Sequence, residues 1–435
     1  MQIDPLAFEL NEQIRKTSKN AYACLSETGR QIYFPAGILT QSAEAKQKAK
    51  KFNATIGIAL ENHAPMHLEA TMRYFNHLKS DEIFTYAPPE GLPGLRRLWK
   101  DKIVRRNPTL TGKQISLPIV TSALTHGLSL IADLFIDAGD VIILPDKLWG
   151  VYNLIFSTRR GGRIATFPMF NAAGGFNVAG MADLMKKEAK TQAKLTILLN
   201  TPNNPTGYTP SVAECQSIYE VVLEQANQGS QIVMLSDDAY FGLFYEDSMK
   251  ESLFSGFCDL HENVLAVKLD AATKEHFVWG FRTGFITFGT VTQNPELLYQ
   301  ALEMKLKGLL RSTISSSNHA SQHIIENILK DPDYEKGINE KFQILKKRAL
   351  KLKRILSDSK FDPDWDFYPF NSGYFMCLKL HRVNAEVLRK HLLDQYQIGT
   401  ISLGDSDLRI AFSCIEEEDI DELVSLIHQA VRDLT

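Results

Sequence analysis

The segment LAVKLDAATKEHFVWGFRTGFITFG, residues 265–289, contains two runs with the apolar alternation of β-strands. The runs are Leu265 to Leu269 and Phe285 to Phe288, and a short connection joins them. Such alternation over four or more residues predicts half-buried or buried strands. The connection carries one lysine, Lys274, and one arginine, Arg282. We therefore expect two strands that place a lysine and an arginine close to the ends of a sheet.

The residue types in this connection suggest a chemical role. A lysine just past a strand end, among small and apolar neighbours, is partly desolvated, which lowers its pKa and favours the nucleophilic neutral amine. An arginine carries a permanent planar charge that suits a phosphate. A phosphorylated carbonyl compound such as pyridoxal phosphate, held as a Schiff base, would use both groups. The alternatives are that Lys274 and Arg282 are ordinary surface charges, or that Lys268, inside the first strand, is the reactive lysine.

Composition limits the class of protein. The chain has 435 residues, of which 44% are hydrophobic and 23% charged, with a net charge of −3. This balance predicts no nucleic acid and no membrane surface as partner. The first twenty residues lack the basic and apolar regions of a secretory signal. Five scattered cysteines without a C-x-x-C spacing indicate no disulfide framework, no metal site and a cytoplasmic location.

Strand-like and helix-like segments alternate between residues 117 and 290, which predicts a doubly wound α/β sheet. Ligands in such sheets bind at the carboxyl ends of the strands. The ends of the expected strands carry, in chain order, a turn at 122–125 that could bind an anion, then Trp149, Asn204, Asp237 with Tyr240, and Lys274 with Arg282. We therefore expect these residues to share one site.

The rest of the chain predicts a second, smaller unit. Residues 325–435 read as charged helices, a strand pair around Gly373, a late strand and an amphipathic terminal helix. Residues 1–65 lack a core of their own, so we assign them to the same α+β domain and leave 66–324 as the large domain. The turn-rich stretch 200–207 contains Asn204–Pro205, which we predict to be a cis peptide bond.

Three motifs, in this order, resemble the class I/II aminotransferases among the fold-type-I pyridoxal-phosphate enzymes. They are NTPNNPTG at 200–207, DDAY at 237–240, and ATK with GFRTG between 272 and 284. The resemblance implies a large, mostly parallel, seven-stranded sheet domain with a smaller α+β domain from both termini. It also implies a homodimer with shared active sites. The implied activity moves an amino group between an L-amino acid and a 2-oxo acid, by a ping-pong mechanism through an internal aldimine on Lys274.

The resemblance also implies roles for residues around the cofactor. Asp237 would face the pyridinium nitrogen, and Tyr240 and Asn204 would donate to the 3-oxygen. Trp149 would stack on the ring. The residues expected to bind the phosphate are Ala123, Leu124, Thr125, Thr273 and Arg282, with Tyr86 reaching the phosphate of the neighbouring subunit.

For the substrate, Arg409 would bind the α-carboxylate, Asn204 would contact the substrate, and Gly37 would belong to the segment that closes over it. Two positions depart from the family pattern. Ala271 stands where a hydroxyl residue is frequent, and Ala123 stands where glycine is frequent. Thr273 is the residue that could supply the missing hydroxyl.

Two alternative functions remain open from the sequence. The first is a pyridoxal-phosphate-dependent β-lyase of the cysteine-S-conjugate type, or another fold-type-I enzyme, because the same lysine and aspartate serve all of them. The second is a non-catalytic regulatory module that binds the cofactor. Regulators on this fold carry a DNA-binding domain, and residues 1–65 contain no basic helix-turn-helix segment. His126 and His276 adjoin the predicted site, and we expect them to be packing residues.

Overall fold

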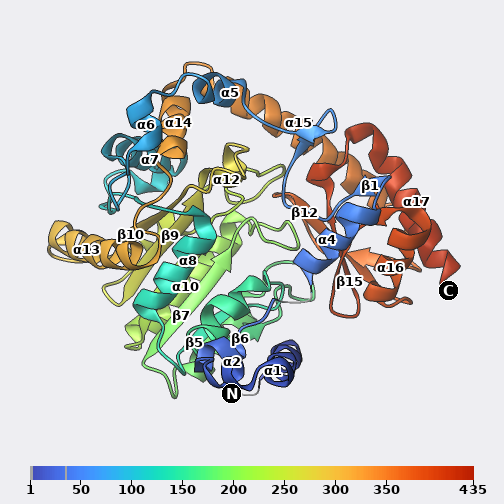
Figure 1. The fold of residues 1–435 in the computed structure, drawn as a ribbon, viewed down its shortest axis with the longest axis horizontal. Helices are drawn as coiled ribbons and strands as arrows, with labels where there is room; N and C mark the ends of the chain where they lie inside the picture. The colour runs from blue at the N-terminus through green and yellow to red at the C-terminus, as the bar shows by residue number, and fades with distance from the viewer. Residues whose placement is uncertain (1–2, 35–36) are drawn as a thin grey trace.

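The computed structural model describes residues 3–34 and 37–435. Its larger sheet has seven strands in the order β4-β10-β9-β8-β7-β5-β6 (Figure 1). The strands are β4 (Ile119–Thr121), β5 (Val141–Pro145), β6 (Arg163–Phe167), β7 (Lys194–Asn200), β8 (Gln231–Asp237), β9 (Val264–Ala271) and β10 (Gly284–Gly289). All neighbours are parallel except β10, which runs antiparallel to both β4 and β9. The predicted mostly parallel seven-stranded sheet is therefore confirmed.

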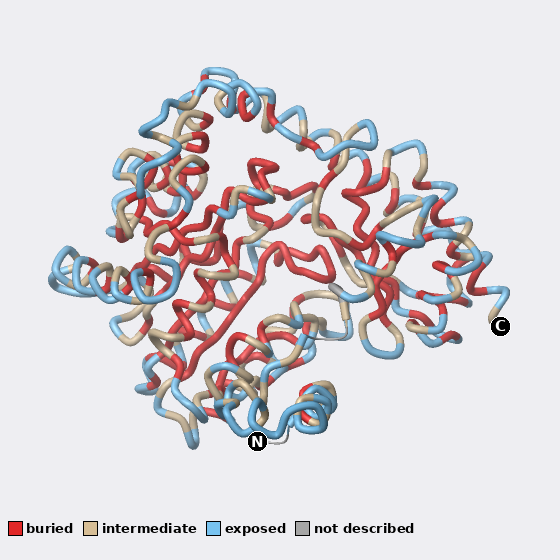
Figure 2. Tube along the Cα trace, viewed as in Figure 1, coloured by how far each residue is buried: buried red, intermediate tan, exposed pale blue. Residues whose placement is uncertain are grey.

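Helices cover both faces of this sheet. They are α7 (Pro93–Arg106), α8 (Ala123–Phe135), α9 (Val178–Glu188), α10 (Val212–Asn227), α11 (Phe254–Phe257), α12 (Ala272–Glu275), α13 (Pro295–Thr313) and α14 (His319–Lys330). One apolar core includes Trp99 of α7 and Ile143 of β5, and another includes Leu128 of α8 and Ile286 of β10. The inner strands are buried on both faces, as Figure 2 shows, which explains their continuous apolar sequences, whereas the edge strand β6 exposes Arg163 and Thr166.

A second sheet lies in the C-terminal part of the chain. It has four antiparallel strands in the order β11-β12-β15-β14. Its elements are β11 (Trp365–Phe367), β12 (Phe375–Leu380), β14 (Ile401–Leu403) and β15 (Asp407–Ala411), with helices α15 (Tyr334–Leu356), α16 (Ala385–Tyr396) and α17 (Ile420–Asp433). This is the smaller α+β unit that the sequence predicts, and Gly373 lies in the connection between β11 and β12.

The N-terminal segment joins this smaller unit. Strand β1 (Phe52–Asn53) pairs in parallel with β13 (Ile398–Gly399). The other elements before the large sheet are α1 (Pro5–Thr17), α2 (Lys19–Ala23), α3 (Glu27–Gln31), α4 (Ile38–Lys48), β2 (Leu60–Glu61), β3 (Ala64–Pro65), α5 (Glu69–Phe75) and α6 (Ser80–Phe84). Short 3-10 or π turns are η1 (Pro108–Leu110), η2 (Asn153–Thr158), η3 (Ser359–Phe361), η4 (Phe412–Cys414) and η5 (Glu417–Asp419).

Two further findings concern the backbone and the surface. The cis peptide bond in the turn after β7 is Thr201–Pro202, so the prediction of Asn204–Pro205 was wrong by one X–Pro step within the same motif. Both prolines follow residues with short polar side chains, and sequence alone does not distinguish them. Among residues 3–34 and 37–435, no helix combines the length and apolar character needed to cross a bilayer.

Candidate active site

A cavity of about 270 Å³ lies at the carboxyl ends of the central strands. It gathers nearly all the residues that the sequence singled out. The predicted residues in its wall are Ala123, Leu124, Thr125, Trp149, Asn204, Asp237, Tyr240, Thr273, Lys274, Arg282 and Arg409. Five further residues that sequence reasoning missed complete the wall, namely Gly57, Tyr152, Asn200, Ala239 and Phe375.

Lys274 lies in α12, the single helical turn that follows β9. Its Nζ is 4.7 Å from the centre of the Tyr240 ring. Desolvation lowers the pKa of Lys274 to about 8, with the positive charge of Arg282 acting in the same direction and Asp237 opposing both. A substantial fraction of the amine is therefore neutral, and nucleophilic, near neutral pH.

Asp237 ends β8 and is the one carboxylate in the described wall of the cavity. Its Oδ2 accepts the hydroxyl of Tyr152 at 2.6 Å. Its Oδ1 accepts the side-chain amide of Asn200 at 3.1 Å and the backbone N–H of Ala239 at 3.1 Å. Burial raises the pKa of Asp237, while these hydrogen bonds and the charge of Lys274 oppose the rise. The carboxylate is thus oriented by three donors.

The groups of the cavity that could bind an anion lie near the start of α8. Arg282 donates to the backbone oxygen of Trp279 at 3.3 Å, and no carboxylate pairs with it in the described part of the chain. The Oγ1 of Thr273 is buried without a hydrogen-bond partner. The first N–H groups of α8, beginning at Ala123, have no intrahelical partner and favour an anion. These groups together are suited to a phosphate.

Two residues at this end have a left-handed backbone. Ala123 has a φ of 66° and Arg282 a φ of 55°. The φ of Ala123 explains why glycine would suit the position where this chain has alanine. Gly284 completes the turn, because a Cβ atom there would lie 2.5 Å from the carbonyl carbon of Ala123. Only glycine fits at such an approach.

Arg409 lies in β15 with 2% of its surface exposed. Its Nη1 donates to the Oδ1 of Asn204 at 3.0 Å and its Nη2 to the backbone oxygen of Thr55 at 2.7 Å. Its Nε has no partner, and the guanidinium lies 4.2 Å from the centre of the Phe375 ring. A buried cation with only neutral partners is costly and calls for an anionic ligand.

Aromatic residues form the remaining walls. Tyr240 is buried beside Phe375, with 5.5 Å between the ring centres, and burial raises the pKa of its hydroxyl, which therefore stays protonated. The Oδ1 of Asn204 is occupied by Arg409, so its amide nitrogen is the group left to donate. Trp149 meets Tyr152 edge-on, with ring centres 5.5 Å apart. Both residues belong to the segment after β5.

Two predicted residues lie outside this cavity. Tyr86 is 91% exposed on the surface. Gly37 lines an adjoining groove of about 870 Å³, which shares Trp149 with the cavity. The glycine in the cavity wall is Gly57, where a Cβ atom would lie 3.6 Å from the hydroxyl of Tyr240. Gly57 stands between two isoleucines in a segment without regular periodicity, so no sequence pattern pointed to it.

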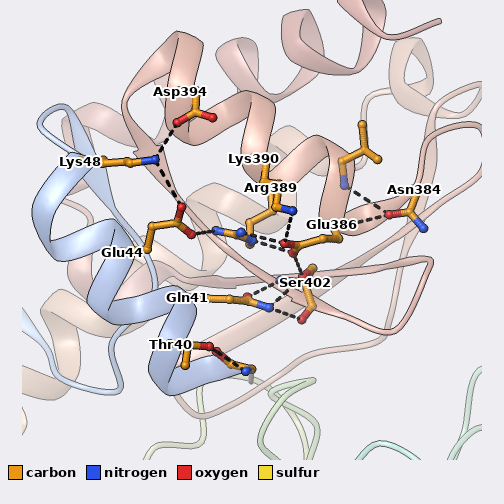
Figure 3. Close-up of polar contacts among 12 residues, drawn as sticks. Thr40, Gln41, Glu44, Lys48, Asn384, Glu386, Arg389, Lys390, Asp394 and Ser402 are labelled. Atoms are coloured by element: carbon orange, nitrogen blue, oxygen red, sulfur yellow. Dashed lines mark hydrogen bonds and ion pairs between the residues drawn. The ribbon is translucent and has the colours of Figure 1, made fainter. Parts of the chain in front are cut away.

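The groove is built on α4, which is fastened to the smaller unit by side-chain contacts (Figure 3). Gln41 exchanges hydrogen bonds with Ser402 at 2.9 Å. Glu44 accepts from Arg389 at 2.9 Å, and Lys48 pairs with Asp394 at 3.2 Å. Gly37 directly precedes α4, and these contacts of α4 with the smaller unit place it in the groove.

Three residues that the sequence placed near the site have other roles. Lys268 is 1% exposed and pairs with Asp238 and Asp270, away from the cavity wall. His276 is fully buried, bonds to the hydroxyl of Tyr334 at 2.9 Å, and has a pKa lowered by desolvation to about 3. His126 accepts the backbone N–H of Ser122. These contacts are those of packing residues.

Comparison with known proteins agrees with this geometry. The family model described as aminotransferase class I and II matches residues 49–427. A probable aspartate/prephenate aminotransferase of Aquifex aeolicus is 26% identical, over 92% of this chain and 97% of its own length. The cytoplasmic aspartate aminotransferase of Schizosaccharomyces pombe is 21% identical, over 88% of this chain and 92% of its own.

Solved structures share the fold. An aminotransferase from Anaerococcus prevotii superposes with a TM-score of 0.82 at 23% identity, covering 91% of this chain and 96% of its own. An aspartate aminotransferase variant from Thermus thermophilus superposes with a TM-score of 0.75 at 16% identity, covering 93% and 99%. The large sheet, the smaller unit and their connection are therefore those of a known architecture.

Proposed function

Because the chain belongs to the aminotransferase class I and II family, we propose that its cavity holds pyridoxal 5′-phosphate on Lys274 and binds an L-amino acid or a 2-oxo acid through Arg409. The chain is a pyridoxal-phosphate-dependent aminotransferase of the fold-type-I architecture. The observation that carries the site assignment is one cavity with a partly neutral lysine, one oriented carboxylate and two arginines that lack carboxylate partners in its described wall.

The residues present fit this cofactor. The start of α8, the unpartnered hydroxyl of Thr273 and Arg282 would hold its phosphate. Thr273 thereby supplies the hydroxyl that Ala271 lacks. Trp149 would cover the ring, and Tyr240 and Asn204 would donate to the ring oxygen. When bound, pyridoxal phosphate supplies an aldehyde that accepts the amino group and a protonated ring that withdraws electrons from the substrate Cα.

Four side chains of the cavity have separate roles in the proposed reaction. Asp237 keeps a ring nitrogen protonated, because its ionised carboxylate stabilises the adjacent positive charge. Arg409 orients the substrate through its α-carboxylate. The neutral Nζ of Lys274 takes the proton from the substrate Cα as a general base, for which a pKa of about 8 is well placed. Tyr240, protonated and buried, donates without giving up its proton.

The test is a paired half-reaction. Borohydride reduction of the protein loaded with pyridoxal phosphate should label Lys274, and peptide mapping should locate the label. Adding amino acids from a panel should remove the absorbance band of the bound cofactor, and a 2-oxo acid should restore it. Labelling of Lys268 instead would refute the site. Release of pyruvate and ammonia without loss of the band would indicate the β-lyase, and a band with no turnover would indicate a regulatory module.

We further propose a homodimer with shared sites. The exposed stretch around Tyr86 supports it, because Phe84, two residues before it, is 82% exposed and exposed aromatic side chains are enriched at interfaces. Tyr86 would reach the phosphate site of the partner. Mixing inactive Lys274→Ala and Tyr86→Ala chains should then restore part of the activity, whereas separate monomers would restore none.

We also propose a cytoplasmic location and the domain division 1–65 with 325–435 against 66–324. All five cysteines are free, and four are buried, which supports a reducing compartment. The relative from Schizosaccharomyces pombe is a cytoplasmic enzyme, which also supports this location. The pairing of Phe52 with Ile398 supports the division, since it joins the two ends of the chain. Limited proteolysis near residues 66 and 324, and cell fractionation, test these proposals.

A further inference from the structure

Asp237 and Lys274 are each followed in the sequence by a buried acidic residue. Asp238 follows Asp237, and Glu275 follows Lys274. Neither acid lines the cavity. Asp238 pairs instead with Lys268 of β9 and accepts the hydroxyl of Ser252 at 2.6 Å. Successive residues at a strand end point to opposite faces, so the partners of Asp238 lie behind the site.

Glu275 has a matching partner from another part of the chain. Its Oε2 lies 2.6 Å from the Nζ of Lys102, which comes from α7. The side chain of Lys102 is 4% exposed and that of Glu275 is 9% exposed. Two lysines that take no part in the proposed chemistry therefore bind the two acids that adjoin Asp237 and Lys274.

The two ion pairs are joined into one buried cluster. Lys268 also lies 3.3 Å from Asp270, and Asp270 accepts the indole N–H of Trp99 at 3.1 Å. The ammonium of Lys102 lies 4.1 Å from the centre of the same indole ring. Trp99 in turn stacks on Phe285 of β10, with ring centres 3.8 Å apart. We call Lys102, Glu275, Trp99, Asp270, Lys268 and Asp238 the buried ion cluster.

Stability alone is a weak explanation for this cluster. Burying charged groups costs free energy, and well-packed apolar residues often replace a buried ion pair without loss of stability. The Oδ1 atoms of Asp238 and Asp270 have no hydrogen-bond partner, so the cluster is not fully satisfied. What an ion pair adds over an apolar contact is direction, because it fixes where each of its two side chains points.

Direction matters at these two positions. The turn α12 has only four residues, so few contacts set its rotation about its own axis. Lys274 and Glu275 point about 100° apart around that axis, so holding Glu275 also sets the direction of Lys274. Asp238 likewise fixes the turn after β8, where its backbone N–H donates to the oxygen of Leu269 at 2.9 Å. That turn carries Asp237 and Tyr240.

We propose that Lys102 and Lys268 are positioning residues, which hold the Nζ of Lys274 and the carboxylate of Asp237 in place through Glu275 and Asp238. The inference rests on the proposed function of Lys274 and Asp237. It assigns to α7, a helix that does not reach the cavity, a direct influence on the chemistry.

The test compares Glu275→Gln, the double variant Lys102→Met/Glu275→Leu, Asp238→Asn and the conservative Lys102→Arg. The matched control is Arg96→Met/Glu303→Leu, which removes the ion pair between the buried Arg96 of α7 and the half-buried Glu303 of α13 without touching the residues next to Lys274. Each protein is loaded with pyridoxal phosphate. The measurements are the unfolding midpoint, the pH at which the cofactor absorbance changes without substrate, and kcat and KM for an active amino donor.

We expect kcat to fall at least about tenfold in the Glu275, double and Asp238 variants, because misplacement of a reacting group by about 1 Å costs up to about a hundredfold. KM should change less than about threefold, the spectral midpoint should move, and Lys102→Arg should retain most of the activity. The control should lose thermal stability only.

Unchanged kcat and spectral midpoint in the folded variants would overturn the inference. So would equal changes in the control, since these would trace the effect to α7 packing. If the double variant does not fold, Asp238→Asn and Glu275→Gln, which keep side-chain shape, decide the question. A wild-type protein that shows no absorbance band and no label on Lys274 would instead refute the proposed function.

Discussion

Replacing Tyr152 with phenylalanine removes the shortest hydrogen bond to Asp237, 2.6 Å from hydroxyl to Oδ2, and keeps the ring in place. Tyr152 is 1% exposed, so no water replaces the lost donor without rearrangement. A hydrogen bond to a charged group contributes about 1.5–3 kcal/mol. Loss of this donor destabilises the ionised carboxylate, so the pKa of Asp237 should rise further above its ordinary value.

The rate should follow from the same free energy. A weaker carboxylate stabilises the protonated ring nitrogen less, and a loss of about 1.5–3 kcal/mol in the transition state lowers kcat about 10- to 150-fold. The sign for stability is also defined. Burial already raises the pKa of Asp237 above its unfolded value, so ionising it opposes folding. The variant should add a penalty that is absent at acid pH and complete once the pH exceeds the folded pKa.

The assay is kcat and kcat/KM as a function of pH, together with urea unfolding at pH 4 and pH 8. Tyr245→Phe is a suitable control, because its buried hydroxyl donates at 2.7 Å to a backbone oxygen and lies outside the cavity. That control should lose stability and keep its pH profile. If Tyr152→Phe matched wild type within about twofold in kcat with the same pH profile, Tyr152 would not orient Asp237, and our account of this carboxylate would be wrong.

Three further outcomes follow. The rate at which the protein reacts with pyridoxal phosphate, measured by reductive labelling, should rise between pH 7 and pH 9 with a midpoint near 8. The reason is that the lowered pKa of Lys274 sets the fraction of neutral amine. A midpoint near 10.5 would contradict the desolvation argument. Arg409→Gln should keep the absorbance band of the cofactor but lower kcat/KM for amino donors about 100-fold, because the ion pair between Arg409 and the substrate α-carboxylate is lost. Unchanged kinetics would show that Arg409 does not bind the substrate. Gln397 is exposed at the end of α16 with a φ of 56°. The variant Gln397→Gly should therefore raise the protein's free energy of unfolding, measured by urea denaturation, by about 0.5–1 kcal/mol. A lower free energy of unfolding would show that the Gln397 side chain is needed.

The residues at strand ends were predictable from sequence because the chemistry and the fold both mark them. Lys274 and Asp237 lie at the ends of apolar runs, and the asparagines, prolines and glycine of the NTPNNPTG motif predict a turn. Tyr152 was missed although it stands three residues after Trp149, because a tyrosine in an apolar segment has the appearance of a core residue. Gly57 was missed because the segment that carries it is held at the cavity by contacts with residues distant in sequence, among them the pairing of β1 with β13 and the bond from Arg409 to the backbone oxygen of Thr55.

The buried ion cluster shows a different limit. Lys102 and Glu275 are separated by most of the large sheet in sequence, and each alone has the pattern of a solvated surface charge. Only packing of α7 behind β9 brings them within 2.6 Å. The cis bond at Thr201–Pro202 shows the same limit at short range, since two X–Pro steps in one motif compete and tertiary contacts choose between them.

The antiparallel pairing of β9 with β10 places Ala271 opposite Gly284. Lys274 and Arg282 therefore stand at the two ends of one closed connection, and the distance between amine and anion site is a property of the sheet itself. The neighbouring groove, by contrast, is assembled from α4, the smaller unit and the segment 148–154 after β5. Substitutions in α4 or in the smaller unit can consequently reshape this groove without altering the connection that carries Lys274 and Arg282.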